Sequence, residues 1–291
     1  MTNLQLWLSA IEIGCFFALI ALGYLLVVVG ADFFNFALGP FAMVGGLGTS
    51  WLVLEQEVPL WPAVALGLLM VLALSAVTEL AVVRPVQRRS GRGELPALVA
   101  VAAVLFAVQQ GAGLIFGRLS LPGQRLLDID PIEVGDAFLQ PGALLLVAAA
   151  VVVFVAVGGF LRFTRTGRLL RAVGDNREAA AVLGLPVGRV RLVAFLLGGL
   201  IAGIAGILYA SKSGVAFTSG LGWTLTGFLA LVIGGTGRVW APLVGGLVLG
   251  VVQVFTPYYI SEIGPETVIL VLALLFFAFR PEGLFVRKVR A

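Results

Sequence analysis

Long stretches without a charged residue make up most of this chain, and the basic residues cluster between them. The eight longest of these stretches cover residues 13–31, 33–54, 58–78, 95–117, 137–161, 192–211, 213–237 and 239–261. Each is long enough to cross the roughly 30 Å hydrocarbon layer of a membrane as a helix that rises about 1.5 Å per residue. A shorter stretch at 267–279 is expected to be a further crossing. The pattern predicts an all-α polytopic membrane protein with about eight or nine transmembrane segments, some of them discontinuous.

The composition excludes several classes of protein. Hydrophobic residues make up 60% of the chain and charged residues 12%, with a mean hydropathy of +1.10, which excludes a soluble enzyme. The chain has no His, so a His-ligated metal site is excluded and no cofactor is expected. It has no Walker A run and contains Lys only at Lys212 and Lys288, so ATP hydrolysis of that kind requires a partner. The basic residues flank apolar runs instead of forming one stripe, which argues against nucleic-acid binding.

The distribution of basic residues predicts the orientation in the membrane. With the amino terminus outside and every segment crossing, all of the 19 Lys and Arg residues fall in inside loops except Arg118, Arg125 and Lys212. Cytoplasmic loops are enriched in Lys and Arg, which favours this orientation. The single transmembrane domain, residues 1–291, then has a cytoplasmic loop at 162–191, an external loop at 118–136 and a cytoplasmic carboxyl terminus.

A helix break is expected early in the second apolar stretch, where Asn35, Gly39 and Pro40 interrupt it. Backbone groups freed by such a break need partners in protein or in a water-filled cavity. Glycines concentrate again near the carboxyl end, and paired interrupted segments indicate a transporter's pathway and a possible diverged internal repeat. The alternative is that these glycines only allow close helix packing. The residues assigned to the translocation pathway are Asn35, Phe36, Gly39, Gly45, Gly46, Gly234, Gly235 and Gly237.

A short helix is predicted within the loop at 162–191. Asp175 and Glu178 have the spacing of a capping box, and the alanines that follow favour a helix. Gly184 can close the helix in the left-handed conformation, and Pro186 prevents its continuation. An isolated helix of fewer than about 12 residues is marginal in water, so this helix needs a partner. The partner is either the membrane face of the protein itself or a groove on a separate cytoplasmic subunit.

This loop and three other segments resemble a known family. The motifs are Thr166–Asn176 continuing through Glu178–Ala180 and Leu183–Leu185, Asn35–Ala37 with Gly39, Phe228–Leu247 with its glycines, and Arg280–Phe285. They are similar to the branched-chain amino acid ABC transporter permeases, and to the LivH-like subunit in particular, over nearly the whole chain. The loop at 162–191 resembles the cytoplasmic coupling loop of that family. This sequence has Leu38 and Pro40 where many members carry His and Glu, so substrate specificity can differ here.

The resemblance implies a permease subunit of an ATP-driven importer in a bacterial-type inner membrane. It implies a second permease subunit, two ATP-binding cassette subunits and an external substrate-binding protein as partners, with a branched-chain or other amino acid moved by alternating access. The residues that it implies for coupling to the ATPase are Gly174, Asp175, Asn176, Glu178, Ala179, Ala180, Leu183 and Gly184. The exact substrate stays open, as does the choice between a homodimeric and a heterodimeric permease pair.

Polar residues inside the apolar stretches are expected to be structural. Glu79 lies about one turn inside the cytoplasmic boundary, where an ion pair with Arg84 or Arg88 is expected. Glu12 is expected to be similar at the outer end. The amides and hydroxyl expected to bond to neighbouring helices are Gln109, Gln110, Gln253 and Thr256. A gradient-driven carrier or facilitator and a membrane scaffold remain as alternatives, although no proton relay is evident for a carrier.

Overall fold

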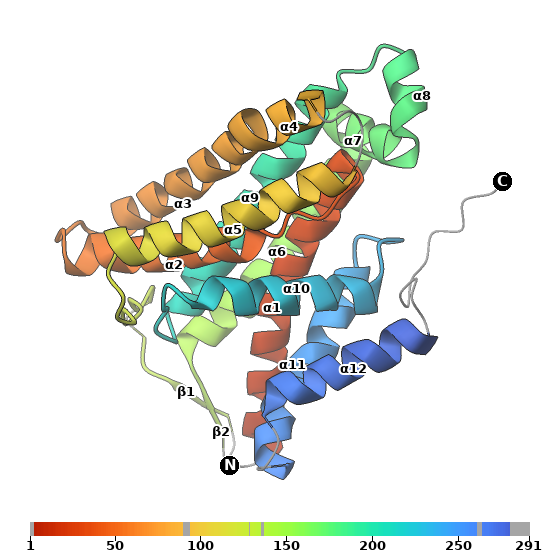
Figure 1. The fold of residues 1–291 in the computed structure, drawn as a ribbon. Coiled ribbons are helices and arrows are strands. Elements are labelled where there is room, and N and C mark those ends of the chain that lie inside the picture. Colours follow the sequence, from red (N-terminus) through yellow and green to blue (C-terminus); the bar gives the residue numbers. More distant parts are fainter. Residues whose placement is uncertain (1–2, 90–93, 128, 135–136, 261–263, 280–291) are drawn as a thin grey trace.

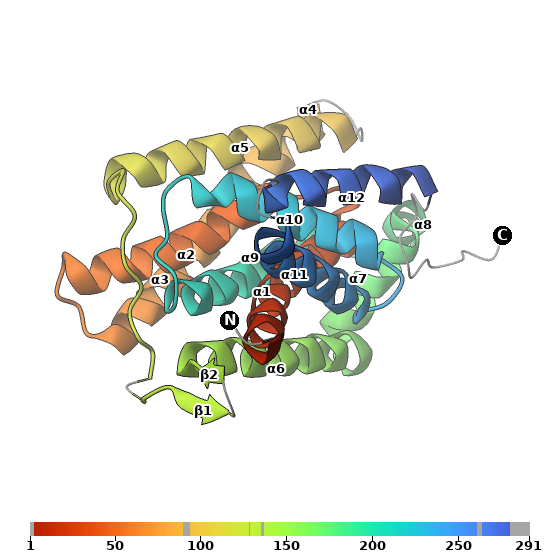
Figure 2. The same cartoon turned by 90° about the horizontal axis from the view of Figure 1, so that it is seen from below.

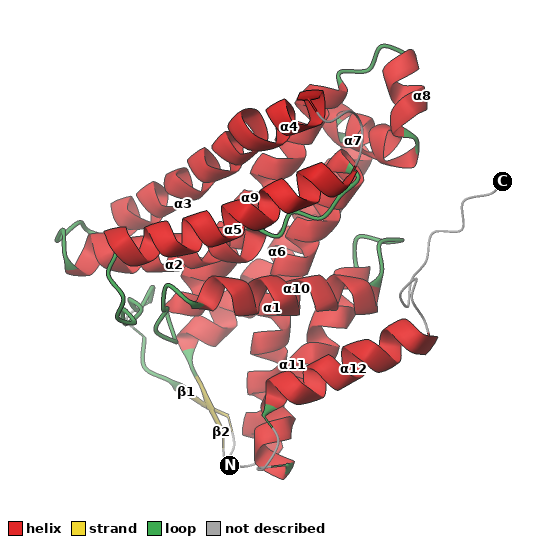
Figure 3. Ribbon diagram, viewed as in Figure 1, coloured by secondary structure: helices red, strands yellow, loops and turns green. Residues whose placement is uncertain are grey.

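The structure, a computed structural model, describes residues 3–89, 94–127, 129–134, 137–260 and 264–279. These residues are almost entirely helical (Figures 1 and 3), as the all-α prediction requires. The helices are α1 Asn3–Ala31, α2 Leu38–Leu54, α3 Leu60–Val77, η1 Thr78–Val83, α4 Arg84–Arg89, α5 Glu94–Ile115, α6 Pro141–Phe163, α7 Arg165–Asp175, α8 Arg177–Val182, α9 Val187–Ala210, α10 Ser219–Gly234, α11 Ala241–Tyr259 and α12 Pro265–Phe279. A small antiparallel hairpin pairs β1 Ile132–Val134 with β2 Ala137–Leu139.

Six helical segments within the described residues are long and apolar enough to span a membrane. Five of them are α1, α5, α6, α9 and α11. The sixth is the continuous helix Leu60–Arg89, which consists of α3, η1 and α4. The apolar stretches at 33–54 and 213–237 are helical only within α2 and α10, because the residues before each helix form turns. The protein is therefore a polytopic helical membrane protein, while eight or nine crossings and the internal repeat remain predictions.

Helix α1 lies at the centre of the bundle. It is buried over most of its length and contacts α6, α7, α9, α10 and α11, and Figure 2 shows it nearly end-on among them. The outer helices α3, α5 and α6 expose large apolar side chains, among them Leu69, Leu114 and Val152. A helix that is apolar on its exposed face needs a solvent that is itself apolar, so these side chains are expected to contact lipid.

The two ends of the bundle carry different elements. In Figure 1, α4, α7 and α8 lie at the upper end, and the amino terminus and the β1–β2 hairpin lie at the lower end. The basic segments at 84–89 and 162–191 therefore share one end, opposite the loop predicted to be external. The motif at 280–285, the carboxyl terminus and the acidic residues Asp128 and Asp136 fall outside the described residues.

Glycines allow the central helices to approach one another very closely. A Cβ added at Gly45 would lie 3.0 Å from the Cα of Gly203, and one added at Gly46 would lie 2.7 Å from the carbonyl oxygen of Gly206, so α2 and α9 pack backbone to backbone. At Gly39 an added Cβ would overlap the carbonyl oxygen of Gly220 in α10. Small residues at such crossings supply the van der Waals contact that holds helices together in lipid, where no hydrophobic effect drives them together.

The crossing of α2 and α10 predicts the effect of one added methyl group. Gly39→Ala should destabilise the protein by about 1–3 kcal/mol, because the new Cβ has no room beside Gly220 and Thr224. Gly111→Ala in α5 is the matched control, since an added Cβ there meets nothing within 4 Å. Thermal unfolding of both variants in detergent measures the difference, and equal midpoints would contradict the close packing described here.

Candidate functional site

The helix break lies between the end of α1 at Ala31 and the start of α2 at Leu38, so it includes Asn35 as predicted, whereas Gly39 and Pro40 lie in the first turn of α2. Asn35 is fully buried in this segment, and its Oδ1 accepts a hydrogen bond from the backbone N–H of Ala37 at 3.2 Å. The Oγ1 of Thr224 in α10 donates to the carbonyl oxygen of Phe36 at 2.9 Å. The freed backbone of the break is thus bonded partly by its own Asn and partly by α10, as an interruption inside a membrane requires.

The other half of the Asn35 amide has no partner in this arrangement. Within the part of the chain that the structure describes, no atom accepts a hydrogen bond from Asn35 Nδ2. A buried donor without an acceptor costs about 1–3 kcal/mol. The role of Asn35 in a translocation pathway stays a prediction.

A cleft of about 620 Å³ lies beside this break, between α10, α11 and α12, with α1 at its inner wall. Its lining is mostly apolar, and exposed leucines such as Leu225 and Leu274 stand among the residues that line it. The polar side chains that line it are Tyr209, Ser219, Thr226 and Gln253. A mainly apolar cleft with a few polar groups is the usual form of a site for a small amphipathic molecule.

Aromatic contacts connect the break to the cleft. The rings of Phe34 and Phe36 pack edge-on against Phe228, with centroids 5.0 Å and 5.7 Å away, and Phe228 lines the cleft. The structure therefore brings the predicted pathway residue Phe36 to within one side chain of the cleft.

The glycines assigned to the pathway do not line this cleft. Those in α2 lie in contacts with α9 and α10, and Gly234 lies against the carbonyl oxygen of Ala241 at the start of α11. Gly235 ends α10 with a positive φ of 89°, and Gly237 follows in the loop. The glycines in α2 and Gly234 therefore have the geometry that the packing alternative expects, and the role of all these glycines in a pathway stays a prediction.

The predicted helix in the loop at 162–191 is present as α8, but the capping residue is one position later than expected. The Oδ1 of Asn176 accepts from the N–H of Ala179 at 2.8 Å, so Asn176 is the N-cap and the Asp175 capping box is wrong. Asp175 is instead the last residue of α7, a helix that the sequence analysis missed. Gly184 does take the predicted left-handed conformation, with φ at 75°.

The sequence of α7 has a pattern that indicates a helix. Its side chains divide into a basic exposed face with Arg165, Arg168 and Arg171 and a buried face with Leu170 and Val173. This is the spacing of an amphipathic helix, and it could have predicted α7 from the sequence.

The two faces of α8 differ sharply in exposure. Ala180 is only 3% exposed and packs with the core, whereas Val182 and Leu183 are 88% and 77% exposed. Both alternatives for the partner of this helix therefore have a physical basis. One face rests on the protein itself, and an apolar tip remains for another surface.

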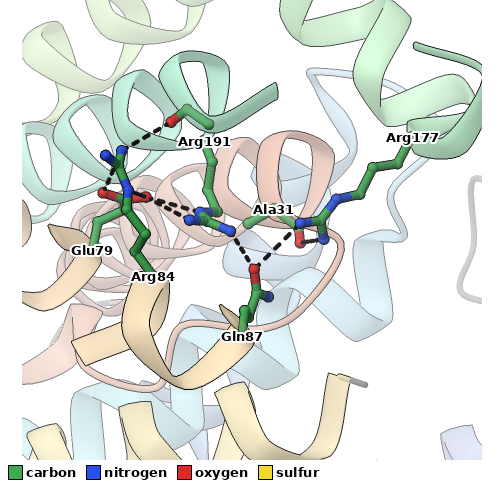
Figure 4. A network of polar contacts seen from close by, with 7 residues as sticks. Ala31, Glu79, Arg84, Gln87, Arg177 and Arg191 are labelled. Atoms are coloured by element: carbon green, nitrogen blue, oxygen red, sulfur yellow. Dashed lines mark hydrogen bonds and ion pairs between the residues drawn. The ribbon is translucent and has the colours of Figure 1, made fainter. Parts of the chain in front are cut away.

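A polar network joins the base of α8 to η1, α4, α9 and α1 (Figure 4). Glu79, in the π-helical turn η1, is fully buried, and its Oε1 accepts from Nε of Arg191 at 2.9 Å. Nη2 of Arg84 lies 3.2 Å from the second oxygen of the same carboxylate. The predicted pair of Glu79 with Arg84 is confirmed, and Arg191 of α9, 112 residues away in the sequence, is a partner that the sequence analysis missed.

The network continues through a single amide oxygen. Oε1 of Gln87 in α4 accepts from Nη1 of Arg191 and, at 3.3 Å, from Nη2 of Arg177. Arg177 is the first residue of α8, and its Nη1 also donates to the carbonyl oxygen of Ala31 at 3.2 Å (Figure 4). The start of α8 is thus bonded to the end of α1 directly and to α9 through Gln87.

Other polar residues in the spans are also paired. Glu12 forms an ion pair with Lys212, a contact that fits its expected structural role. Gln109 of α5 accepts from the N–H of Leu221 in the first turn of α10 at 3.2 Å, which confirms its expected interhelical hydrogen bond. Among the described residues, no three His, Cys, Asp or Glu side chains gather as metal ligands.

Comparison with known proteins gives the family of this chain. A family model described as the permease component of the branched-chain amino acid transport system matches residues 8–279. The high-affinity branched-chain amino acid transport permease LivH of Salmonella typhimurium is 28% identical over 310 residues, covering 97% of this chain and 94% of its own. LivH of Escherichia coli is 26% identical with the same coverage of 97% and 94%.

A shorter sequence match and a structural match were also found. The ribose import permease RbsC of Escherichia coli is 36% identical over 106 residues, which cover 34% of this chain and 33% of its own. A chain of PsaBC from Streptococcus pneumoniae, solved in complex with Fab, has a TM-score of 0.50 at 11% identity, covers 94% of this chain and 89% of its own, and shows the fold alone. These relatives named as permeases are transport subunits, not enzymes. Since the family model spans most of its length, the chain belongs to the branched-chain amino acid ABC transporter permease family.

Proposed function

We propose that this chain forms half of the membrane channel of an ATP-driven importer and receives mechanical work through α8. The observation that carries the proposal is the exposed apolar tip of α8 at Val182 and Leu183, on a helix anchored to the protein by its other face. An apolar tip beside charged residues at one end of a membrane bundle suits a groove on a partner subunit. The partner in that role is an ATP-binding cassette subunit, one for each of two permease subunits.

Docking of α8 to an ATP-binding cassette subunit also implies how the chain is oriented in the membrane. The end that carries α4, α7 and α8 holds the basic segments and faces the cytoplasm, while the amino terminus and the hairpin face an external substrate-binding protein (Figure 1). A gradient-driven carrier is less well supported. The buried acids of the described spans, Glu12 and Glu79, are both paired with basic residues near opposite ends of the bundle and offer no midplane carboxylate for ion coupling.

The cleft beside α10 is proposed as part of the substrate path. Its apolar wall suits an aliphatic side chain, and Thr226 and Gln253 offer hydrogen-bonding groups for the polar end of an amino acid. The relatives that match almost the whole chain are named as branched-chain amino acid permeases, and the match to the ribose permease covers a third of it. A branched-chain or related aliphatic amino acid is therefore the substrate proposed.

The docking role of α8 is tested by placing a charge on its exposed tip. Val182→Asp should weaken binding of the ATPase by roughly a hundredfold, because an unpaired charge buried in an interface costs about 3 kcal/mol. Leu119→Asp is the matched control, since Leu119 is 81% exposed in the loop predicted to be external, away from α8. Co-purification of the ATPase and uptake into vesicles are measured together. Normal uptake by the Val182 variant would refute docking at this tip.

Filling the cleft tests the substrate path. An added Cβ at Gly222 meets nothing within 4 Å, so Gly222→Phe should fold normally and place a ring in the cleft. Uptake should fall to background while both permease subunits and the ATPase still co-purify. Gly111→Phe, also in open space but on α5, should transport normally. Full uptake with Phe at position 222 would show that substrate passes elsewhere.

The network at Gln87 predicts a variant that binds the ATPase but couples ATP hydrolysis less efficiently to uptake. Gln87→Leu removes an acceptor shared by two guanidinium groups, each such bond contributing about 1.5–3 kcal/mol. Less substrate should then enter per ATP hydrolysed, with the ATPase still bound. Gln87→Glu keeps an acceptor and should keep the coupling ratio, and Gln140→Leu at the start of α6 is a control for loss of an amide. An unchanged ratio in Gln87→Leu would remove Gln87 from the coupling path.

A further inference from the structure

We propose that the cavity between α4, α8 and α9 binds the phosphate of an anionic phospholipid headgroup. The cavity has a volume of about 410 Å³ and is lined by Arg84, Gln87, Arg88, Arg177, Arg189 and Arg191 among others. The proposal rests on the membrane location of the chain and on the proposed cytoplasmic position of this end, and not on its coupling to ATP.

The charges around the cavity are not balanced. Its lining has five arginines and no acidic residue, and the nearby carboxylate of Glu79 pairs with Arg84 and Arg191. Arg88 and Arg189 are exposed on its wall, and the guanidinium group of neither has a hydrogen bond or ion pair to another described residue. Guanidinium groups converging on one space form the donor arrangement that recognises phosphate.

Hydrogen bonds within the protein already hold several of the arginines that line the cavity. Gln87 Oε1 accepts from both Arg177 and Arg191, and Arg84 Nη2 also donates to the carbonyl oxygen of Gly188 at 3.4 Å (Figure 4). These bonds connect α4 with the starts of α8 and α9, so binding would require little reordering of the basic side chains.

Apolar surface beside the cavity favours a lipid over a soluble anion. Val77 and Leu80 lie on the same continuous helix, one to two turns before Arg84, and are 57% and 43% exposed. The headgroup can therefore meet the arginines while its acyl chains lie along this apolar stretch. Basic pockets between helix ends on the cytoplasmic side are suited to anionic headgroups for this reason.

The experiment measures lipid binding to the purified full-length permease complex by native mass spectrometry. The probes are phosphatidylglycerol, phosphatidylcholine and inorganic phosphate. The double variant Arg88→Gln with Arg189→Gln should bind phosphatidylglycerol roughly 25-fold more weakly than the unmodified complex. Arg165→Gln with Arg168→Gln removes the same charge from α7, outside the cavity lining, and should bind as the unmodified complex does. Both doubles alter exposed side chains, and unchanged melting temperatures check that they fold.

Tighter binding of phosphatidylglycerol than of the other two probes, lost only in the Arg88 and Arg189 double variant, would support the proposal. Equal loss in the two doubles, or binding of inorganic phosphate as tight as that of the lipid, would overturn it. A double variant that keeps its lipid but loses the co-purifying ATPase would assign the cavity to an acidic protein surface and would also overturn the lipid assignment.

Discussion

Backbone contact between helices at glycine is the interaction on which the arrangement of this protein depends. Lipid provides no hydrophobic drive for helices to associate, so the bundle is held by van der Waals contact and by interhelical hydrogen bonds. Gly39, Gly45 and Gly46 bring α2 against α10 and α9, where a side chain would overlap backbone atoms. The short helix α2 is thus held against α9 and α10. The break before it is tolerated because α10 bonds the freed carbonyl of Phe36.

The polar network around Glu79 is a second interaction that holds helices together. Glu79 is fully buried, and an isolated buried carboxylate would be very costly, so it requires the guanidinium groups of Arg84 and Arg191. The pairing ties the end of the Leu60–Arg89 helix to the start of α9. Once these helices are fixed, Gln87 lies where it can also bond Arg177, and the six-residue helix α8 gains the support that it lacks on its own.

Charge spacing predicted the membrane class well, because an uncharged stretch of sufficient length has few other stable environments. The break at Asn35 was also visible, but its extent was not, because Gly39 and Pro40 are tolerated in the first turn of α2. The cap of α8 was misplaced by one residue because Asp175 and Asn176 are both good capping residues, and only the end of α7 decides between them. The buried face of α8 was unreadable, as consecutive alanines carry no amphipathic contrast. Arg191 could not be found as the partner of Glu79, because one sequence does not show which distant segments meet.

Helix α1 connects the two sites of the proposed mechanism, the helix α8 and the cleft beside α10. Its last residue, Ala31, accepts a hydrogen bond from Arg177 at the start of α8, and Ile13 and Phe17 on the same helix line the cleft. An unbroken helix transmits a displacement along its axis with little bending, whereas the segment at 32–37 after it can absorb a change in backbone angles. In the proposed mechanism, a pull on α8 would reach the cleft through α1, while α2 would keep its contacts with α9. Alternating access, as proposed for this protein, would then need only a shift of one central helix relative to partners that it already touches.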